Sequence, residues 1–333
     1  MSHSNISIFV PHIGCPNMCS FCNQHTISGV QNAPTAEDVR RICTQAMEEI
    51  RSPEDTEIAF FGGSFTAIPR EYMHQLLDAA KEFVGDGKFS GIRISTRPDR
   101  ITPQILTELK SYGVTSIELG AQSMSDEVLA ANHRGHTSED IELSAMMIRD
   151  WGFELGLQMM IGLYKSTPAY EIDTASRIIS LDPDTARIYP VVILKGTALA
   201  ELYQSGEFVP YAFDKAVDIS AACLAMFEEQ GIKVIKCGLH ASEFVEQDMI
   251  GGFYHPAFRE LCEGLIYRRN MEFLINSGSG NSWYEIAVSP NCISKAMGHK
   301  KANAEYFAAK GVTIKITGDC SLEKYQCEIR GCR

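Results

Sequence analysis

Apolar and polar residues alternate along residues 1–237 with two different periods. Short apolar runs bounded by polar or glycine residues are typical of buried strands, and they occur at 6–10, 57–61, 91–96, 114–119, 153–160 and 185–194. Between these runs the apolar residues recur every three to four positions, which indicates amphipathic helices, at 35–50, 69–84, 103–112, 138–151 and 168–180. The pattern therefore predicts consecutive βα units.

Strands that alternate with helices at this spacing favour a parallel sheet covered by helices. Six units predict an α/β fold, a partial (β/α)6-type TIM barrel with a small C-terminal α/β extension. A helix at 214–230 and a short strand at 233–237 follow the barrel. The periodic recurrence of apolar residues is interrupted over 238–256. It resumes from 283 to 316 as a smaller β-α-α-β pattern. We expect a barrel unit, residues 1–245, and a small α/β domain, residues 246–333.

Several predicted strands are followed by glycines, polar residues or a cysteine. Cys15, Gly62-Gly63, Ser95-Thr96, Gln122 and Gln158 lie at or just beyond a strand end. All strands of a parallel barrel end at one face, and barrel enzymes carry their active sites there. We therefore expect these residues to share one site.

The loop after the first strand contains Cys15, Cys19 and Cys22 with C-x3-C-x2-C spacing. Three thiolates this close can hold three irons of a cubic iron–sulfur cluster, which leaves the fourth iron open for chemistry. A structural zinc site is an alternative, but such sites close with four ligands, for which His12 and His25 are the nearest candidates. Plain buried thiols are a third interpretation.

Composition narrows the class of protein. The chain has 333 residues, 45% of them hydrophobic, and no apolar run near the ~20 residues needed to span a bilayer. With 11 cysteines and no N-terminal secretion signal, metal binding in a reducing cytoplasm is expected rather than a disulfide framework. The net charge of −12 argues against a protein that coats nucleic acid. Residues 251–333, however, carry 11 Lys/Arg against 8 Asp/Glu. The charge of this region is therefore compatible with local contact to nucleic acid.

The cysteine loop and the barrel resemble the radical S-adenosylmethionine (SAM) superfamily, and more narrowly the radical SAM part of the Elongator catalytic-subunit family of tRNA-modifying enzymes. The matching stretches follow the family order and are Phe61-Gly62-Gly63-Ser64-Phe65, Thr96-Arg97-Pro98-Asp99, 117–123, 132–137, 159–163 and Ile188-Tyr189-Pro190. Three features depart from that family. We expect no acetyltransferase domain within residues 1–333, the cysteines are closer together, and the usual Gly-Leu-Pro-Gly turn reads Gly162-Leu163-Tyr164-Lys165.

The resemblance implies a 4Fe-4S cluster on Cys15, Cys19 and Cys22 whose open iron binds SAM. It implies reductive cleavage of SAM to a 5′-deoxyadenosyl radical that abstracts hydrogen from a substrate, and an electron donor of the flavodoxin or ferredoxin type. The expected SAM contacts are Gly62, Gly63, Ser64, Thr96, Gln122, Ser123, Arg134, Gln158 and Met160. The alternatives are a strand-end turn for the glycines, a surface ion pair for Arg134, helix caps for the polar residues and packing for Met160.

Cys237, His240 and His255 lie beyond the barrel in segments expected to be irregular, where a thiol or imidazole would transfer hydrogen atoms or protons. A buried thiol and two hydrogen-bonded histidines are the alternative. Cys320, Cys327 and Cys332 are candidates for a second cluster, but their spacings fit no familiar pattern.

The segment Gly298-His299-Lys300-Lys301 lies between two expected helices and resembles the Gly-x-x-Gly loop of a KH domain, which clamps a nucleic-acid backbone. Lys301 replaces the second glycine. Lys300 and Lys301 are the candidate RNA contacts, and a small cap with a solvated basic turn is the alternative.

Together these features favour a radical SAM enzyme that acts on RNA, in particular a tRNA base. One alternative is a radical SAM enzyme with a small-molecule substrate, such as a tetrapyrrole or another metabolite. Another is a non-catalytic iron–sulfur or zinc protein that binds RNA. No membrane association is expected.

Overall fold

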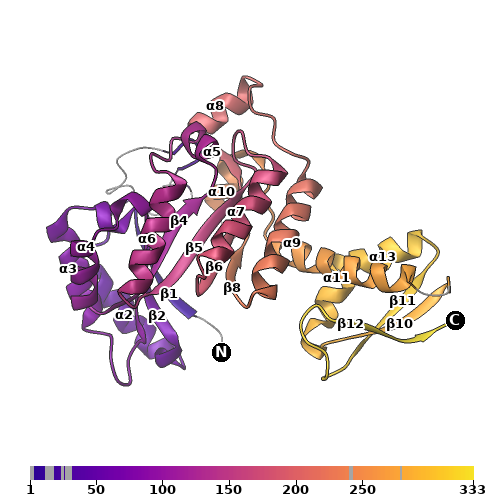
Figure 1. Ribbon diagram of the computed structural model, residues 1–333. Helices are drawn as coiled ribbons and strands as arrows, with labels where there is room; N and C mark the ends of the chain where they lie inside the picture. Colours follow the sequence, from indigo (N-terminus) through magenta and orange to yellow (C-terminus); the bar gives the residue numbers. More distant parts are fainter. Residues whose placement is uncertain (1–3, 12–18, 24–25, 27–31, 240–242, 278–279) are drawn as a thin grey trace.

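The computed structural model describes the chain except for residues 1–3, 12–18, 24–25, 27–31, 240–242 and 278–279. Figure 1 shows a large unit, with the N-terminus, and a small unit, with the C-terminus. The helices α9 (Phe213–Glu229) and α11 (Phe258–Asn276) lie where the two units meet.

The large unit is built on a sheet of seven parallel strands. In spatial order they are β1 (Ser4–Val10), β2 (Thr56–Gly62), β3 (Gly91–Thr96), β4 (Val114–Gln122), β5 (Glu154–Ile161), β6 (Thr185–Pro190) and β8 (Lys233–Cys237). Because β1 and β8 are the two edges, the barrel is open. The predicted partial barrel is confirmed, with β8 as a further strand of the same sheet.

Helices cover the outside of this sheet (Figure 1). Besides α9 the large unit contains α2 (Ala36–Glu49), α3 (Arg70–Lys81), α4 (Pro103–Ser111), α5 (Asp126–Ala131), α6 (Ser138–Asp150), α7 (Pro168–Ser180), α8 (Ala198–Gln204) and α10 (Glu243–Asp248). Capping boxes at Thr35 and Thr137 start α2 and α6, and a first-turn proline starts α4 and α7. The apolar helix faces and the outward side chains of the strands form one core.

The predicted strand at 185–194 is wrong in its second half. β6 ends at Pro190, which has no N–H to donate to the sheet, and the chain continues as β7 (Val192–Leu194). β7 pairs antiparallel with β9 (Met249–Gly252) in a separate two-stranded sheet. Gly252 has φ +90°, and a Cβ atom there would lie 2.5 Å from the Val191 carbonyl oxygen, so this pairing requires glycine. Both β9 and α10 lie in the region where the sequence pattern lapses.

The small unit contains a three-stranded sheet in the order β11-β10-β12. The predicted β-α-α-β pattern is confirmed as β10 (Trp283–Val288), α12 (Ile293–Met297), α13 (Ala302–Ala309) and β11 (Thr313–Gly318), and β12 (Cys327–Cys332) was not predicted. β10 pairs parallel with β11 and antiparallel with β12. Short 3-10 helices occur in both units, at Pro53–Asp55, Phe65–Ala67, Pro98–Arg100, Pro290–Cys292 and His299–Lys301.

Helix α11, which the sequence pattern did not predict, contributes to both cores. Its first half buries Phe258, Cys262 and Ile266 in the barrel core, and its second half buries Tyr267 and Met271 in the core of the small unit. The division after residue 245 stays a prediction, because α11 follows that point and packs on both sides.

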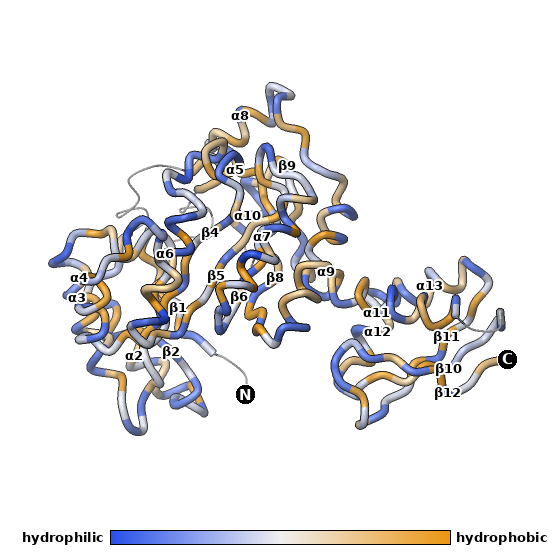
Figure 2. The backbone as a smooth tube through the Cα atoms, in the orientation of Figure 1, coloured by the Kyte–Doolittle hydropathy of each residue, from blue (hydrophilic) through white to orange (hydrophobic). Residues whose placement is uncertain are grey.

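Hydrophilic and hydrophobic segments alternate along the chain (Figure 2). In the part of the chain that the structure describes, no helix combines the length and apolar character needed to cross a membrane. The buried apolar residues are instead divided between the barrel core and the smaller core below α11, α12 and α13.

Candidate active site in the partial barrel

The concave side of the seven-stranded sheet contains a cavity of ≈ 390 Å³ to which all seven strands contribute. Five predicted site residues line it, namely Cys22, Gly62, Gln122, Gln158 and Met160. The structure therefore brings together residues that are up to 138 positions apart in the sequence. The convergence follows from the common direction of the strands, which end at one face.

The cysteine loop is anchored to the barrel through Ser20, the residue after Cys19. The Ser20 N–H donates to the Asn132 carbonyl oxygen at 3.1 Å, and Ser20 Oγ donates to Asn132 Oδ1 at 2.9 Å. The Leu199 N–H donates to the Ser20 carbonyl oxygen at 2.7 Å. Asn132 is fully buried, so the loop is attached to a rigid part of the molecule. Cys15 lies outside the described residues.

Arg134 lies beside the cysteine loop and is buried. One guanidinium nitrogen donates to Cys19 Sγ at 3.1 Å, and a second donates to the Gly120 carbonyl oxygen. Its Nε is buried with no hydrogen-bond partner among the described residues. An unpaired buried donor on a cation is costly, but Arg134 itself does not line the cavity.

Gly62 and Gly63 form the end of β2 against the end of β1. Gly62 has φ +116°, and a Cβ atom there would lie 2.6 Å from the Val10 carbonyl oxygen. The Gly63 N–H donates to this same oxygen at 3.0 Å. Glycine is therefore required for the close approach of two strand ends next to the cysteine loop, whatever further contact Gly62 makes inside the cavity.

The three predicted SAM contacts with hydroxyl groups, Ser64, Thr96 and Ser123, have hydrogen-bond partners within the protein. The hydroxyls of Ser64 and Thr96 lie 2.8 Å apart and join the loops after β2 and β3. Ser123 Oγ accepts the N–H of Ser125, the N-cap of α5, at 3.1 Å. The hydroxyls of Ser64 and Thr96 order the strand ends. Ser123 stabilises the start of α5, which agrees with the helix-cap alternative for the polar residues.

Gln122 combines two unusual features. It has φ +66°, a left-handed conformation that costs a non-glycine residue about 1–3 kcal/mol. Its Oε1 is buried with no hydrogen-bond partner among the described residues, although the residue lines the cavity. Strain and an unpaired acceptor together indicate a residue that is held in place for a ligand.

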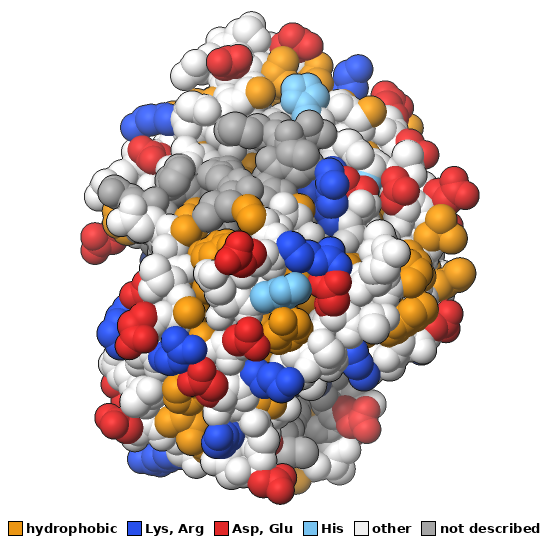
Figure 3. Space-filling model, turned by 90° about the vertical axis from the view of Figure 1, so that its left-hand side faces the viewer, with side chains coloured by type: hydrophobic (Ala, Val, Ile, Leu, Met, Phe, Trp, Pro, Cys, Tyr) orange, Lys and Arg blue, Asp and Glu red, His pale blue; other side chains and the backbone are white. Residues whose placement is uncertain are grey.

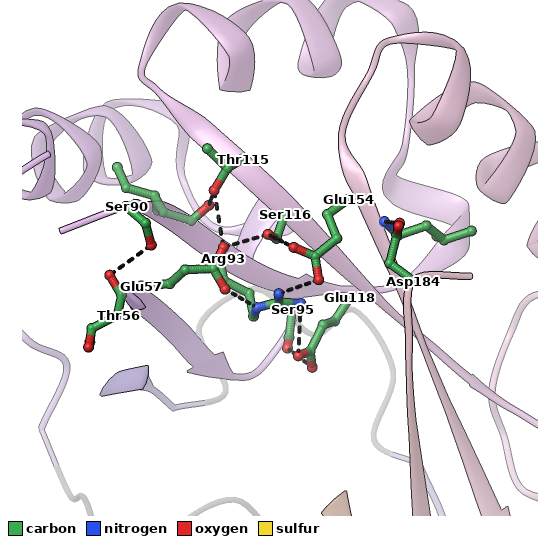
Figure 4. A network of polar contacts seen from close by, with 12 residues as sticks. Thr56, Glu57, Ser90, Arg93, Ser95, Thr115, Ser116, Glu118, Glu154 and Asp184 are labelled. Carbon is green, nitrogen blue, oxygen red and sulfur yellow. Dashed lines mark hydrogen bonds and ion pairs between the residues drawn. The ribbon is translucent and has the colours of Figure 1, made fainter. Parts of the chain in front are cut away.

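The barrel interior also contains a charged network that the sequence interpretation missed (Figure 4). Arg93 is fully buried and donates to Glu57 Oε2 at 2.7 Å and to Glu154 Oε1 at 2.8 Å. Ser116 Oγ joins the same two carboxylates, at 2.5 and 3.0 Å. The available signal was a charged residue at alternate positions of otherwise apolar strands. The same alternation is typical of a sheet with one solvated face, so it does not show that these charged residues lie inside the barrel.

Glu118 links this network to the cavity. Its Oε1 accepts from Arg187 at 2.8 Å and lies 3.5 Å from Arg93, and its Oε2 accepts from Gln158 Nε2 at 2.8 Å. Arg187 also donates to the Tyr189 hydroxyl at 3.2 Å and stacks over Phe61, 4.9 Å from the ring centre. Gln158, a predicted SAM contact, is thus oriented by a buried carboxylate.

Two of the candidate catalytic residues can be placed, and neither lines the cavity. The expectation of an irregular segment is wrong for Cys237, which is the last residue of β8 in the barrel sheet. Cys237 pairs with Ile188, and its Sγ is buried 4.0 Å from the Sγ of Cys262. His255 Nδ1 accepts the Ala257 N–H at 3.0 Å. Burial and the neighbouring His299 ring lower the pKa of His255. His240 lies outside the described residues.

The candidate RNA contacts Lys300 and Lys301 are exposed in the loop between α12 and α13. Both adopt left-handed backbone conformations, with φ +51° and +65°. The ring of His299, in the same loop, lies 5.3 Å from that of His255. The loop is therefore positioned against the segment that connects the barrel to α11.

The three C-terminal cysteines do not form a cluster site. Cys327 and Cys332 begin and end β12, which separates their Cα atoms by roughly 17 Å at 3.4 Å per residue. Among the described residues no group of three metal-ligating side chains is close enough to hold an ion. The cysteine loop after β1 includes undescribed positions, so this finding does not bear on it.

Fold and site together define an open parallel α/β barrel with a cysteine loop after its first strand. The sequence matches the Radical SAM superfamily over residues 9–178 and the Radical SAM C-terminal domain over residues 183–268. The chain belongs to the radical SAM superfamily.

Relatives among curated proteins include Elongator complex protein 3 of Homo sapiens, 30% identical over an alignment of 195 residues, with coverage of 53% of this chain and 36% of the relative. The tRNA uridine(34) acetyltransferase of Methanocaldococcus infernus is 28% identical over an alignment of 196 residues, with coverage of 53% of this chain and 37% of that protein. The chain thus spans little more than a third of the curated relatives that it matches. The resemblance to the radical SAM part of the Elongator catalytic subunit is confirmed.

Solved structures show the same fold. Elp3 of Methanocaldococcus infernus with an N-terminal deletion superimposes with a TM-score of 0.63 at 20% identity, covering 81% of this chain and 64% of that one. SuiB of Streptococcus suis bound to SAM gives 0.51 at 15% identity, covering 73% and 52%.

The described residues fit the cofactors that the superfamily implies. Cys19 and Cys22 lie on an anchored loop, and Cys22 borders the cavity together with Gly62 and Gln122. The unpaired Arg134 Nε and Gln122 Oε1 are a donor and an acceptor of the kinds that the carboxylate and hydroxyl groups of SAM require.

Proposed function

We propose that this protein is a cytoplasmic radical SAM enzyme that modifies a base of tRNA. The observation that carries the chemical part is the shared cavity, where the cysteine loop, the strand-end glycine and the unpaired Gln122 acceptor meet. Cys15, Cys19 and Cys22 would hold a 4Fe-4S cluster, which leaves one iron for SAM. When bound, the reduced cluster and SAM supply a radical that removes a hydrogen atom from the substrate.

The chain itself positions and shields these groups. Asn132 and Leu199 hold the cysteine loop through Ser20. Arg134 would bind the SAM carboxylate through its free Nε, and Gln122 a ribose hydroxyl. Gly62 and Gly63 would admit the SAM amino group, and Gln158 and Met160 would contact the adenosine from β5. An electron donor of the flavodoxin or ferredoxin type would reduce the cluster.

Two observations support tRNA as the substrate. The curated relatives include a tRNA uridine(34) acetyltransferase, and the α12–α13 turn exposes Lys300 and Lys301 in a KH-like position. The face shown in Figure 3 gives no general attraction for nucleic acid, since acidic and basic side chains are interspersed over it. Binding would therefore be local rather than along the whole molecule.

The test is anaerobic incubation of the reconstituted protein with dithionite, deuterated SAM and bulk tRNA. We expect 5′-deoxyadenosine, and deuterium or added mass in one nucleoside. Replacing Cys15, Cys19 or Cys22 with Ala should abolish SAM cleavage, whereas the exposed Cys320→Ala control should retain it. No 5′-deoxyadenosine from the wild type would disprove the enzyme proposal. Cleavage without any change in tRNA would disprove the substrate assignment alone.

A further inference from the structure

Two cations face the barrel cavity from neighbouring strands. Arg187 of β6 and Lys236 of β8 are register partners, and both line the cavity. A bulge produces this pairing, because the register shifts after Ala186, which pairs with Val234. Val234 is buried in the core on the helix side. In a regular strand Lys236, two residues after Val234, would point to the same helix-covered side as Val234. The bulge therefore directs Lys236 into the cavity and Cys237 away from it.

Lys236, unlike Arg187, has no acidic partner among the described residues. The carboxylate that pairs with Arg187, Glu118, also lies 3.5 Å from Arg93. The Arg187 Nε is buried with no hydrogen-bond partner in the described part of the chain. Lys236 makes no ion pair or hydrogen bond with any described residue, and burial together with Arg187 lowers its pKa. Like charges directly opposite each other destabilise a sheet, so this arrangement carries a cost that a bound anion would remove.

The other walls of the cavity suit an aromatic ligand. Phe9, Phe21 and Phe61 line it beside the two cations. Nucleobases stack on aromatic side chains, and phosphate pairs with arginine and lysine. β8 is the edge strand of the open barrel, and Lys236 also borders a pocket between β8 and the start of α11. Lys236 is thus on the edge strand, whereas Arg187 extends from β6 to the Phe61 ring of β2.

We propose that Arg187 and Lys236 form a phosphate-binding subsite that holds the substrate nucleotide in the barrel, an inference that rests on the proposed function and specifies the substrate end of the same cavity. The phosphate lies between the two cations, and the base lies against the phenylalanine rings. The subsite explains why two cationic side chains are kept opposite each other on the cavity side of an open barrel edge.

The test is equilibrium binding of four probes to the reconstituted holoenzyme: uridine 5′-monophosphate, uridine, inorganic phosphate and acetate. We expect the wild type to prefer the monophosphate over uridine. Lys236→Met should weaken monophosphate binding about tenfold, the effect of one lost charge-assisted contact, and leave uridine binding unchanged. Lys236→Arg should restore most of the affinity. Lys233→Met is the matched control, since Lys233 is an exposed lysine on the same strand.

Equal binding of uridine and its monophosphate by the wild type would overturn the proposal, as would an unchanged preference in Lys236→Met. Acetate that competes as well as phosphate would overturn the phosphate assignment. A parallel loss of SAM affinity in Lys236→Met would show that the anion is the SAM carboxylate, which also overturns it. The proposed function would be disproved by a different result, namely absent SAM cleavage or unmodified tRNA in the wild type. The preference among the probes is measured by equilibrium binding without turnover, so the two outcomes are distinguishable.

Discussion

The seven-stranded and the three-stranded sheet of this molecule have similar alternation of apolar and charged positions, yet their charged faces lie in opposite environments. In the barrel, Arg93 of β3 is fully buried and is surrounded by carboxylates. In the small unit, Arg330 of β12 is 44% exposed and pairs with Asp319 and Glu328 at the surface. The same kind of residue at the same kind of strand position is interior in one sheet and solvated in the other.

The difference comes from curvature. Seven strands curl far enough to enclose their concave face, so each charge on that face must find a partner or a ligand. Three strands covered on one side by α11, α12 and α13 leave the other face in water. In a closed TIM barrel bulky branched residues fill the interior, whereas here charges and a cavity occupy it. An enclosed charged face therefore indicates a binding site, and an exposed one indicates only a surface.

The largest expected effect tests this contrast with one arginine from each sheet. Arg93→Met leaves Glu57, Glu118 and Glu154 without their shared cation, and breaking a buried ion pair costs about 3–5 kcal/mol of unfolding free energy. Arg330→Met should cost at most about 1 kcal/mol, because surface pairs contribute little. Urea unfolding of the two apo variants measures both. Equal losses of unfolding free energy in the two variants would contradict the proposed difference between the enclosed and the exposed sheet face.

The pH dependence of stability sharpens the barrel side of the comparison. Burial, together with Arg134 and Arg97, lowers the pKa of His136 to about 4 from 6.5. The unfolded state then binds a proton more readily than the folded state, so stability is lost as pH falls from 6.5 towards 4, by about 3 kcal/mol. His136→Gln should remove this loss, and the exposed His133→Asn control should keep it. An unchanged pH profile in His136→Gln would disprove the assignment.

Glu171 should produce the opposite slope. Burial raises the pKa of its carboxyl to about 7 from 4.5. The folded state therefore holds the proton more tightly, so the stabilisation from Glu171 is present below pH 4.5 and lost as pH rises towards 7. Glu171→Gln should steepen the rise of stability with pH that His136 causes. The measurement is unfolding free energy at pH 4.5, 5.5, 6.5 and 7.5, and a flatter profile in Glu171→Gln would contradict this sign.

A smaller effect is expected from asparagines that anchor each unit. Asn132→Ala removes the buried amide that binds Ser20, Val128 and Tyr164, and should cost about 2 kcal/mol and lower the iron content after reconstitution. Asn270→Ala in the small unit removes one contact, to the Tyr325 carbonyl oxygen, and should leave the iron content unchanged. Full iron incorporation in Asn132→Ala would show that Asn132 does not position the cluster loop.

The smallest effect is expected at the exposed loop of the small unit. Lys300→Glu with Lys301→Glu should weaken tRNA binding about tenfold and reduce the slope of log affinity against log salt by about 0.7 for each lost phosphate contact. Lys315→Glu, an exposed lysine on β11 that pairs with Glu285, is the matched control. Filter binding at several salt concentrations measures both, and equal affinity and slope in all three proteins would remove the small unit from RNA recognition.

Much of the fold was predictable because it depends on local periodicity. Helices such as α6 and α7 begin at capping threonines that the sequence displays, and most strands lie within a few residues of their predicted bounds. Helix α11 was missed because it packs against two different cores and lacks a single apolar stripe. β12 was missed because its burial alternates between intermediate and exposed.

By itself the sequence determined the kind of element at most positions, the parallel βα order and the spacing of Cys15, Cys19 and Cys22, because these features depend on neighbours along the chain. It also placed Gly62, Gln122 and Gln158 at one face, since parallel strands end together. Only the tertiary structure decided which side chains face the interior. Curvature enclosed Arg93 and Glu118, and one bulge in the β6–β8 register turned Lys236 into the cavity and Cys237 into the core. Curvature and the bulge arise from contacts between distant strands, so the pattern of one strand alone does not show them.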